Sequence, residues 1–425
     1  MIGEVFEPTV LAGIPLRNRI IRSATHEGMA DERGYPTEAL KQTYLRLAKG
    51  NVGAIITGYA GVQPNGKSPL YRMLMIDNDE AASSYEGIVQ AVHANNTSIV
   101  LQIAHCGRQT RSKIIGERPV APSAIRDKFY NEDLPKELTS EEIEALIVNF
   151  VNAIERARRA GFDGVQLHAA HGYLLSQFLS PYMNRRQDKW GGTTENRFRI
   201  LHEIYTRARE RVGDFPILIK INAYDGRRQG MRLEEAVRIA RRLEHVGCSG
   251  IEISCGTSED GFYTVRGAKA PLKAVFNYTF RYKSYPAFFQ NLMLRFANFI
   301  IPPVAPLKNY NVDAAQEIKS QLSIPVIVVG GITSLDDIAG IIENNKADAV
   351  SMSRPFIIEP NIVKKFQEGV QRTSKCIACN YCLVASEERP LRCYYGKLDR
   401  SLGNLDEKTA NIFQQGFKRY GRDNS

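Results

Sequence analysis

Short apolar runs alternate with longer amphipathic stretches along most of the chain, and this alternation predicts parallel strands connected by helices. Eight runs have the length of a strand and are mostly apolar on both faces, as expected for strands buried in a parallel sheet. They span residues 19–23, 53–57, 98–103, 164–168, 217–221, 250–254, 325–329 and 349–353.

Amphipathic stretches between these runs predict helices. The clearest covers residues 140–160, where apolar side chains recur at helical spacing and Thr139 with Glu142 forms a capping-box pattern. Eight strands alternating with eight helices predict an α/β fold, a (β/α)₈ TIM barrel, which needs about 250 residues. The other predicted helices span residues 37–49, 80–93, 195–212, 233–246, 313–321, 335–344 and 360–371.

The chain has 425 residues, so a barrel leaves a surplus. After the sixth strand, residues 257–309 are dense in aromatic and basic side chains. We interpret them as a long insertion that serves as a helical cap on the barrel mouth, a substrate lid or the interface of a homo-oligomer. We therefore predict a barrel domain over residues 1–372, followed by a Cys-containing segment and a basic tail over residues 373–425.

Composition narrows the class of protein. Hydrophobic residues make up 43% and charged residues 24% of the chain, as in soluble globular proteins. The formal net charge of +10 is spread out and accompanies no nucleic-acid-binding motif, so we expect no nucleic-acid partner but an attraction for phosphorylated small molecules. No run approaches the ~20 apolar residues of a membrane span, and the N-terminus lacks the features of a signal peptide. We expect a cytoplasmic protein.

Polar and titratable residues follow the predicted strands at their C-terminal ends, where barrel enzymes carry their active sites. His168 ends the fourth strand, and His171 and Tyr173 follow it. The imidazoles could bind a metal, act as acids or donate hydrogen bonds to a substrate oxygen. Because no carboxylate accompanies them, we favour a donor pair that polarises a carbonyl, with Tyr173 supplying a proton.

Other strand ends suit a phosphorylated heterocycle. Lys220 offers a cation to a bound ring or phosphate, and Gln102 offers both donors and an acceptor to the edge of a heterocycle. Glycines and an arginine after the last two strands suit a phosphate group. This predicted phosphate site consists of Gly330, Gly331, Ser353 and Arg354.

Four of the seven cysteines cluster near the end of the chain with the spacing C-x₂-C-x₂-C-x₁₀-C. A disulfide framework is not expected in a long cytosolic chain, so they are metal ligands or reactive thiols. Four thiolates suit a [4Fe–4S] cluster or zinc, and a metal-free segment is the alternative. The four residues are Cys376, Cys379, Cys382 and Cys393.

Several of these stretches resemble the old yellow enzyme family, the FMN-dependent NAD(P)H:flavin oxidoreductases. The resemblance covers roughly residues 4–372 and rests on FEP, LRNRII, LQIAHCGRQ, FDGVQLHAAHGYLLSQFLSPYMNRRQDKWGGTTENRFR, PVIVVGGI and SMSRP. It implies a (β/α)₈ barrel that binds FMN and takes hydride from NADH or NADPH. It also implies reduction of the activated C=C bond of a small α,β-unsaturated carbonyl compound.

By position, the resemblance implies roles for individual residues. His168 and His171 would bind the substrate oxygen, Tyr173 would protonate the alkene, and the phosphate site named above would hold the FMN phosphate. The flavin ring would be surrounded by Ala24, His26, Tyr59, Gln102 and Lys220. Three of these depart from the family pattern, which usually has Pro at position 24, Cys or Thr at 26, and often Arg at 220.

The cysteine cluster is similar to the [4Fe–4S] site of larger relatives such as the dienoyl-coenzyme A reductases, although its spacing is tighter. The FAD and NAD domains of those relatives have no counterpart in this sequence. The alternative hypothesis is therefore an electron-transfer subunit that acts with a separate partner reductase. A third hypothesis is a non-redox barrel enzyme that uses the phosphate site alone.

Overall fold

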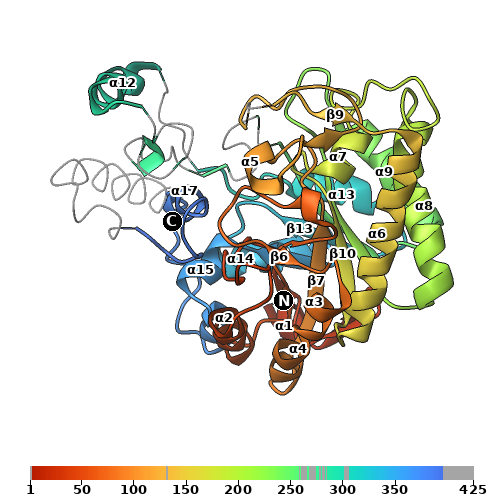
Figure 1. Ribbon diagram of the computed structural model, residues 1–425. Helices are drawn as coiled ribbons and strands as arrows, with labels where there is room; N and C mark the ends of the chain where they lie inside the picture. Colours follow the sequence, from red (N-terminus) through yellow and green to blue (C-terminus); the bar gives the residue numbers. More distant parts are fainter. Residues whose placement is uncertain are drawn as a thin grey trace.

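Eight parallel strands close into a barrel in the computed structural model, which describes residues 2–130, 133–257, 259, 266–267, 274–276, 279, 283, 285–300 and 306–395 (Figure 1). Pairing of β10 with β7 closes the ring, which confirms the predicted barrel. Around the barrel the strands are β3 (Ile20–Arg22), β4 (Ala54–Ile56), β7 (Ser98–Ala104), β10 (Gly164–Ala169), β11 (Ile217–Asn222), β12 (Gly250–Ser254), β13 (Val326–Val329) and β14 (Ala349–Met352).

Helices surround the strands (Figure 1). The longer ones are α2 (Glu38–Lys49), α4 (Glu86–His93), α6 (Ser140–Arg159), α8 (Thr194–Val212), α9 (Leu233–His245), α12 (Ala287–Ile300), α13 (Val312–Lys319) and α14 (Leu335–Glu343). The shorter ones are α1 (Ile2–Phe6), α3 (Asp79–Ser83), α5 (Ser112–Ile115), α7 (Leu174–Leu179), α15 (Arg354–Ile358), α16 (Ile362–Gln367), α17 (Tyr381–Ala385) and the 3₁₀ helix η1 (Pro64–Gly66). None of the described helices combines the length and the apolar character needed to cross a membrane.

Local sequence accounts for several helix boundaries. The capping box of α6 is present: the Thr139 side chain accepts a bond from the Glu142 N–H, and the Glu142 carboxylate accepts one from the Thr139 N–H. The helix predicted over 80–93 is instead split into α3 and α4, and the bend buries Tyr85. The helix predicted over 360–371 is shorter, because Gly369 takes a φ of 69° that ends helices.

A short hairpin closes the barrel at the N-terminal ends of its strands. It consists of β1 (Thr9–Leu11) and β2 (Ile14–Leu16), whose side chains pack on apolar residues that line the lower barrel. Since side chains alternate along a strand, the next inward position lies two residues nearer the mouth. There the apolar Ile21, Val100, Leu218 and Ala349 give way to Ser23, Gln102, Lys220 and Ser351.

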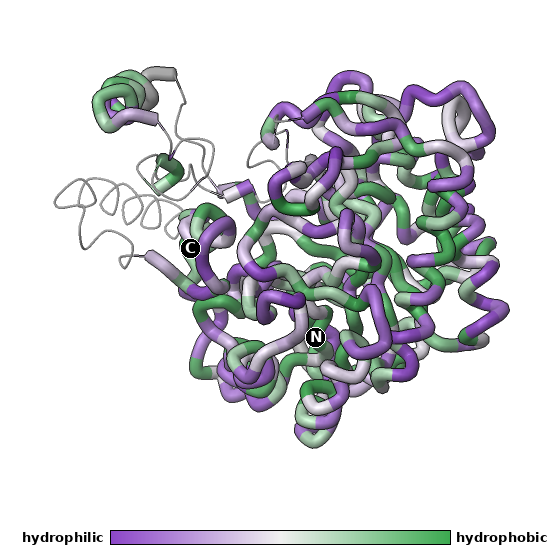
Figure 2. Tube along the Cα trace, in the orientation of Figure 1, coloured by the Kyte–Doolittle hydropathy of each residue, from purple (hydrophilic) through white to green (hydrophobic). Residues whose placement is uncertain are grey.

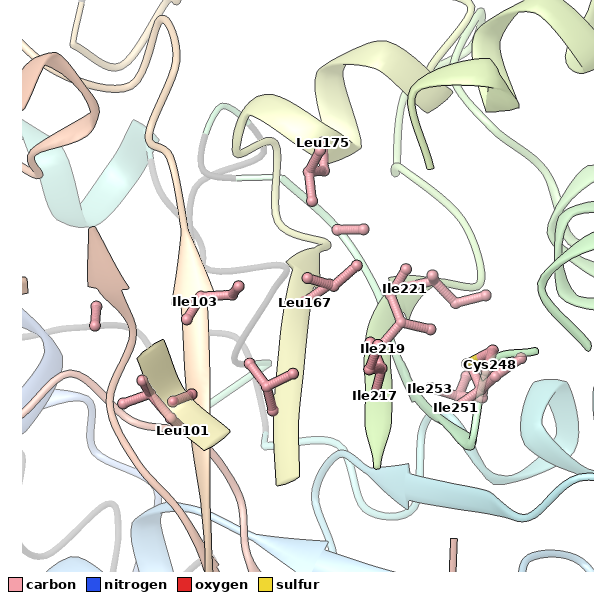
Figure 3. Packing of buried hydrophobic residues seen from close by; sticks show 14 of the residues in the cluster. Leu101, Ile103, Leu167, Leu175, Ile217, Ile219, Ile221, Cys248, Ile251 and Ile253 are labelled. Atoms are coloured by element: carbon pink, nitrogen blue, oxygen red, sulfur yellow. The ribbon is translucent and has the colours of Figure 1, made fainter. Parts of the chain in front are cut away.

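The outer face of the strands packs against the helices and is mostly apolar, with Arg22 of β3 as a buried charged exception that pairs with Glu27. Figure 3 shows Leu101, Ile103, Leu167, Ile219 and Ile253 of four neighbouring strands in this core. Such side chains make the barrel strands hydrophobic in Figure 2, whereas the outer helices alternate between hydrophobic and hydrophilic positions. The remaining strands are short: β5 (Ala60–Gly61), β6 (Leu74–Met75), β8 (Val120–Ala121) and β9 (Lys136–Glu137).

A second, small core lies beside the barrel and joins the insertion to the cysteine segment. Its buried members are Ala274, Cys379, Tyr381, Val384, Ala385 and Tyr394. Lys283 of the insertion also forms an ion pair with Glu388, with 2.7 Å between Nζ and Oε1. We call the described residues between 274 and 300, together with 374–395, the satellite.

Helix α12 belongs to the satellite and projects from the barrel (Figure 1). The interpretation of the insertion as a cap packed on the mouth is therefore wrong for this helix, whose side chains from Ala287 to Phe296 are exposed except for the partly buried Gln290 and Leu294. Much of the remaining insertion, and the predicted basic tail beyond residue 395, lie outside the described residues. The predicted domain boundary at residue 372 stays a prediction.

Candidate active site

Three neighbouring strands present polar side chains at the same height in the barrel. In the parallel register, His168 of β10 lies opposite Lys220 of β11, and Lys220 lies opposite Glu252 of β12. Residues opposite each other in adjacent strands point to the same face of a sheet. All three are buried, so the register brings an imidazole, an ammonium and a carboxylate together below the mouth.

Glu252 connects the polar groups of the barrel interior. Its carboxylate accepts hydrogen bonds from Ser23 Oγ (2.7 Å), Ser351 Oγ (2.6 Å) and Gln166 Nε2 (2.7 Å), and Oε2 lies 3.2 Å from Lys220 Nζ. Burial acts to raise the pKa of Glu252, but the Lys220 charge and these bonds outweigh it and hold the pKa below its usual value. Burial lowers the pKa of Lys220, and Glu252 is the main group that opposes this.

Gln102 joins the same network, because its Nε2 donates to Oε1 of Gln166 over 2.7 Å. Our sequence analysis named Gln102 and Lys220 but missed Gln166 and Glu252. The signal was present: each is a polar side chain inside an apolar strand, GVQLHA and GIEIS. Burying such a group is costly unless it finds a partner, so it points to a network.

The two predicted histidines lie together at the mouth. Their ring centroids are 5.1 Å apart and the rings are nearly perpendicular. His171 takes a φ of 63°, unusual for a residue with a side chain; its N–H donates to Asn222 Oδ1 (3.1 Å), and its Nε2 lies 2.7 Å from Ser254 Oγ. Among the described residues, His168 Nδ1 is buried without a hydrogen-bond partner. The site thus contains an imidazole nitrogen ready for a ligand.

Burial sets the charge of both imidazoles. It lowers the pKa of His171 to about 3, and it lowers that of His168 well below the usual value, with His171 and Lys220 adding to the effect. Both rings are therefore neutral at neutral pH, and each carries one N–H donor.

Tyr173 completes the group and is linked to a second tyrosine. Its ring centroid is 4.7 Å from that of His168, and its hydroxyl donates to the Tyr59 hydroxyl over 3.2 Å. Tyr59 in turn donates to Ser68 Oγ over 3.1 Å. Burial raises the pKa of Tyr173 well above the usual value, so the phenol keeps its proton. Ser68 is a further residue that the sequence analysis missed.

The residues after β3 lie on the other side of Tyr59. The His26 ring stacks on the Tyr59 ring with 5.3 Å between centroids, and its Nε2 lies 2.8 Å from the Tyr71 carbonyl oxygen. Burial lowers the pKa of His26. Ala24 is partly buried against the apolar lower barrel. Tyr59 therefore connects His26 to the His168–Tyr173 side of the mouth.

The predicted phosphate residues come together at the ends of β13 and β14, which are adjacent strands. Gly330 and Gly331 take φ values of 144° and 71°, and a Cβ on Gly331 would collide with the Leu307 carbonyl oxygen. Ser353 Oγ lies 2.8 Å from Thr25 Oγ1, which ties it to the residues after β3. Arg354 Nη1 donates to Asn380 Oδ1 over 3.0 Å, which ties it to the cysteine segment.

The chemistry of this set of groups fits FMN. Arg354, Ser353 and the two glycine backbones suit a phosphate, whereas Lys220 and Gln102 offer a cation and mixed hydrogen-bonding groups to a heterocycle. The unpartnered Nδ1 of His168 offers a further polar contact at the mouth. The site thus contains suitable side chains for both the phosphate and the ring of FMN.

The four clustered cysteines lie within electrostatic reach of one another. Burial, together with neighbouring thiols including Cys393, raises the pKa of Cys376, that of Cys379 to about 11 and that of Cys382 to about 12. Backbone N–H groups of Ala378 and Tyr381 donate to the sulfurs of Cys376 and Cys379. In the described part of the chain, no three His, Cys, Asp or Glu side chains have the spacing of metal ligands. The metal assignment stays a prediction.

Comparison with known proteins identifies the family. The model of the NADH:flavin oxidoreductase / NADH oxidase family matches residues 4–259 and 303–373. The chain is 36% identical over 397 residues to NADH oxidase of Thermoanaerobacter brockii, covering 92% of this chain and 55% of that protein. It is 32% identical over 359 residues to NADPH dehydrogenase of Geobacillus thermodenitrificans, covering 84% and 91%. The chain belongs to the NADH:flavin oxidoreductase / NADH oxidase family, so the resemblance predicted from its motifs is confirmed.

Other comparisons concern length and fold. The chain spans about half of some relatives, including 50% of a metal reductase of Desulforamulus reducens with 31% identity over 378 residues, or 88% of this chain. Among solved structures, an old yellow enzyme homologue from Zymomonas mobilis has a TM-score of 0.68 at 23% identity, covering 91% of this chain and 99% of that one. A 2-naphthoyl-CoA reductase has a TM-score of 0.78 at 23% identity, covering 92% and 57%. These likenesses support the barrel fold.

Proposed function

We propose that this chain uses FMN and NADH or NADPH to reduce the activated C=C bond of a small α,β-unsaturated carbonyl compound. The observation that carries the proposal is the grouping of His168, His171 and Tyr173 around one point of the barrel mouth, with His168 Nδ1 unpartnered among the described residues. Neutral donors beside a protonated phenol suit an oxygen that gains negative charge while a neighbouring carbon gains a proton.

In this proposal Gly330, Gly331, Ser353 and Arg354 would hold the FMN phosphate. The residues that would surround its ring are Ala24, His26, Tyr59, Gln102 and Lys220. When bound, FMN supplies a two-electron carrier between the nicotinamide and the substrate. Lys220 provides positive charge beside the ring, and Glu252 positions Lys220 and favours its charged form.

The histidines bind and polarise the substrate oxygen. Because burial keeps both pKa values low, they act as neutral donors rather than as acids. His168 can bind a substrate through the nitrogen that lacks a partner, whereas His171 exchanges its contact with Ser254 for one with the substrate. Each such donor is worth about 10²–10³ in turnover in comparable oxyanion sites.

Tyr173 supplies the proton to the carbon that follows the carbonyl. Its raised pKa keeps the proton on the phenol until transfer. The hydroxyls of Tyr59 and Ser68 form a chain through which a proton can return to Tyr173 afterwards.

The names of the relatives agree with NAD(P)H-dependent reduction but differ in substrate. They include NADPH dehydrogenases, a 4,4'-dithiodibutanoate disulfide reductase of Rhodococcus erythropolis and the metal reductase. We favour an activated alkene as the substrate because the barrel mouth offers hydrogen-bond donors for the carbonyl oxygen and a phenol that can protonate the alkene carbon.

Absorbance spectroscopy of the purified protein tests the proposal. We expect flavin bands that bleach with NADH or NADPH and return when an enone such as 2-cyclohexenone is added. A colourless protein that cannot be reconstituted with FMN would rule out the proposal. Bands that bleach but do not respond to any enone would remove the substrate assignment alone.

A double variant tests the two histidines. His168→Ala with His171→Ala is expected to abolish enone turnover while FMN stays bound, because the substrate oxygen loses both donors. The matched control is His202→Ala with His245→Ala, which removes two exposed imidazoles and leaves turnover unchanged. Equal turnover of the two double variants would contradict the assignment.

A second candidate function is an electron-transfer subunit. It is favoured by the position of Cys376 and Cys382, which lie within electrostatic reach of Arg354 at the proposed phosphate site. Iron and sulfide analysis discriminates between the two functions, together with a test of whether NADH or NADPH alone reduces the flavin. Stoichiometric iron and sulfide with a flavin that needs a second protein for reduction would favour this candidate.

A further inference from the structure

The insertion has a charge that sets it apart from the rest of the chain. From residue 261 to residue 312 the sequence holds no Asp or Glu, whereas it holds seven Lys and Arg residues. The segment therefore contributes +7 to a net charge of +10. A cationic segment of this kind attracts a partner that carries negative charge.

Helix α12 combines this charge with an exposed apolar face. Among the described side chains from Ala287 to Phe296, Gln290 and Leu294, one turn apart, are the partly buried ones. Arg295 is the helix's one charged residue, and it is exposed. The exposed apolar side chains are Phe288 (73%), Phe289 (55%), Leu292 (41%), Met293 (37%) and Phe296 (54%).

The position of α12 lets this face reach a flat partner. The helix projects beyond the barrel in Figure 1, and Figure 2 shows it as largely hydrophobic. The chain before the helix is tied to the cysteine segment by the small satellite core and by the ion pair of Lys283 with Glu388. Because the helix projects, its exposed apolar face can contact a flat surface while the barrel stays clear of that surface.

The sequence of α12 suits the surface of a membrane rather than its interior. Fourteen residues of helix are about 21 Å long, short of the ~30 Å hydrocarbon core. Phenylalanines beside cationic residues are typical of helices that lie in the headgroup region and bind anionic lipids. Arg295, exposed beside the phenylalanines, supplies a cation on the helix itself.

We propose that α12 docks this protein on an anionic membrane surface, with its phenylalanine face in the headgroup region and Arg295 on a lipid phosphate. A second copy of the chain suits this face less well, because two acid-free segments would bring like charges together. The same repulsion is absent for anionic lipid.

Co-sedimentation with lipid vesicles tests this proposal on the full chain. Vesicles of phosphatidylcholine with phosphatidylglycerol should bind the protein, and vesicles of phosphatidylcholine alone should bind it much less. Phe288→Gln, Phe289→Gln and Phe296→Gln together should lower the partition coefficient by more than about tenfold, because the buried apolar area is lost. The matched control, Val10→Gln, Ile114→Gln and Val370→Gln, changes three exposed apolar residues elsewhere and should bind as before.

Charge is tested separately from apolar area. Arg295→Gln should weaken binding about fivefold, and high salt should weaken it further. Equal binding to both kinds of vesicle, no binding to either, or full binding by the phenylalanine variant would overturn the proposal. A dimer in solution that the phenylalanine variant dissociates, without vesicle binding, would assign the face to a second copy instead. None of these residues belongs to the proposed active site, so flavin content should stay unchanged in every variant.

Discussion

The barrel mouth and the satellite both gather reactive side chains, but they hold them by different means. At the mouth, His168, Lys220 and Glu252 stand on three hydrogen-bonded strands in register. In the satellite, the four thiols lie on residues 374–395, where the one helix is the five-residue α17. Ala378 and Asn380, in the turns before this helix, take φ values of 55° and 61°. One set is positioned by a sheet, and the other by turns.

This difference has consequences for stability and for charge. A barrel strand cannot shift one side chain without its neighbours, so the groups of the mouth are expected to act as a unit. The six buried residues of the satellite core form a cluster separate from those of the barrel, so we expect that the satellite can change while the barrel stays intact. Four predictions test this contrast.

The largest effect is expected from removal of the proton donor. Tyr173→Phe should lower enone turnover by about 10²–10⁴-fold, because a general acid contributes that much. Flavin reduction by NADH or NADPH should be unaffected, which rapid mixing can measure. Tyr59→Phe, a matched control one hydrogen bond further away, should lower turnover much less. Equal losses in the two variants would place the donor elsewhere.

The next effect concerns the buried ion pair. Glu252→Gln should reduce the free energy of unfolding by about 3–5 kcal/mol, because Lys220 is left buried without its counter-charge. Lys220→Met in the same chain should restore part of the loss, which chemical denaturation of a double-mutant cycle can show. Additive losses would mean that the two residues do not interact, and would contradict the network centred on Glu252.

A smaller effect is expected from pH. The folded-state pKa values of His168 and His171 lie below the unfolded value of about 6.5, so the unfolded chain binds protons more readily. The contribution of the two neutral histidines to the free energy of unfolding is therefore fully present above about pH 6.5. It falls as the pH drops toward 3, by up to about 1.4 kcal/mol per pH unit for each histidine. Denaturation at several pH values should show a shallower slope for His168→Asn with His171→Asn; an unchanged slope would contradict the assignment.

The smallest effect on the barrel is expected from the satellite. Cys382→Ser should remove any bound iron or zinc, yet change the barrel's unfolding free energy by less than about 0.5 kcal/mol. Cys248→Ala is the matched control, because Cys248 is buried in the barrel core. It should lower the free energy of unfolding by about 1 kcal/mol and leave the metal content unchanged. Metal analysis and thermal unfolding measure both. Loss of flavin in Cys382→Ser would show that the two regions depend on each other.

Much of the fold could be predicted from the chain because barrel strands are apolar on both faces. Runs such as 250–254 and 217–221 stand out for this reason, and the structure places strands there. The helix over 80–93 was harder, since its periodic pattern continues across the bend at Tyr85 that splits it into α3 and α4. Periodicity records which residues are buried, not where a helix bends.

The sequence by itself determined the strand ends, and with them the side chains that face the mouth: His168, Lys220 and Arg354 follow or close apolar runs. Only the tertiary structure decided which polar side chains interact with one another. Glu252 is one polar residue in an apolar run until the parallel register sets it beside Lys220, with the hydroxyls of Ser23 and Ser351 within reach. The physical reason is that partners on different strands are set by the closure of the barrel, which joins residues far apart in the chain.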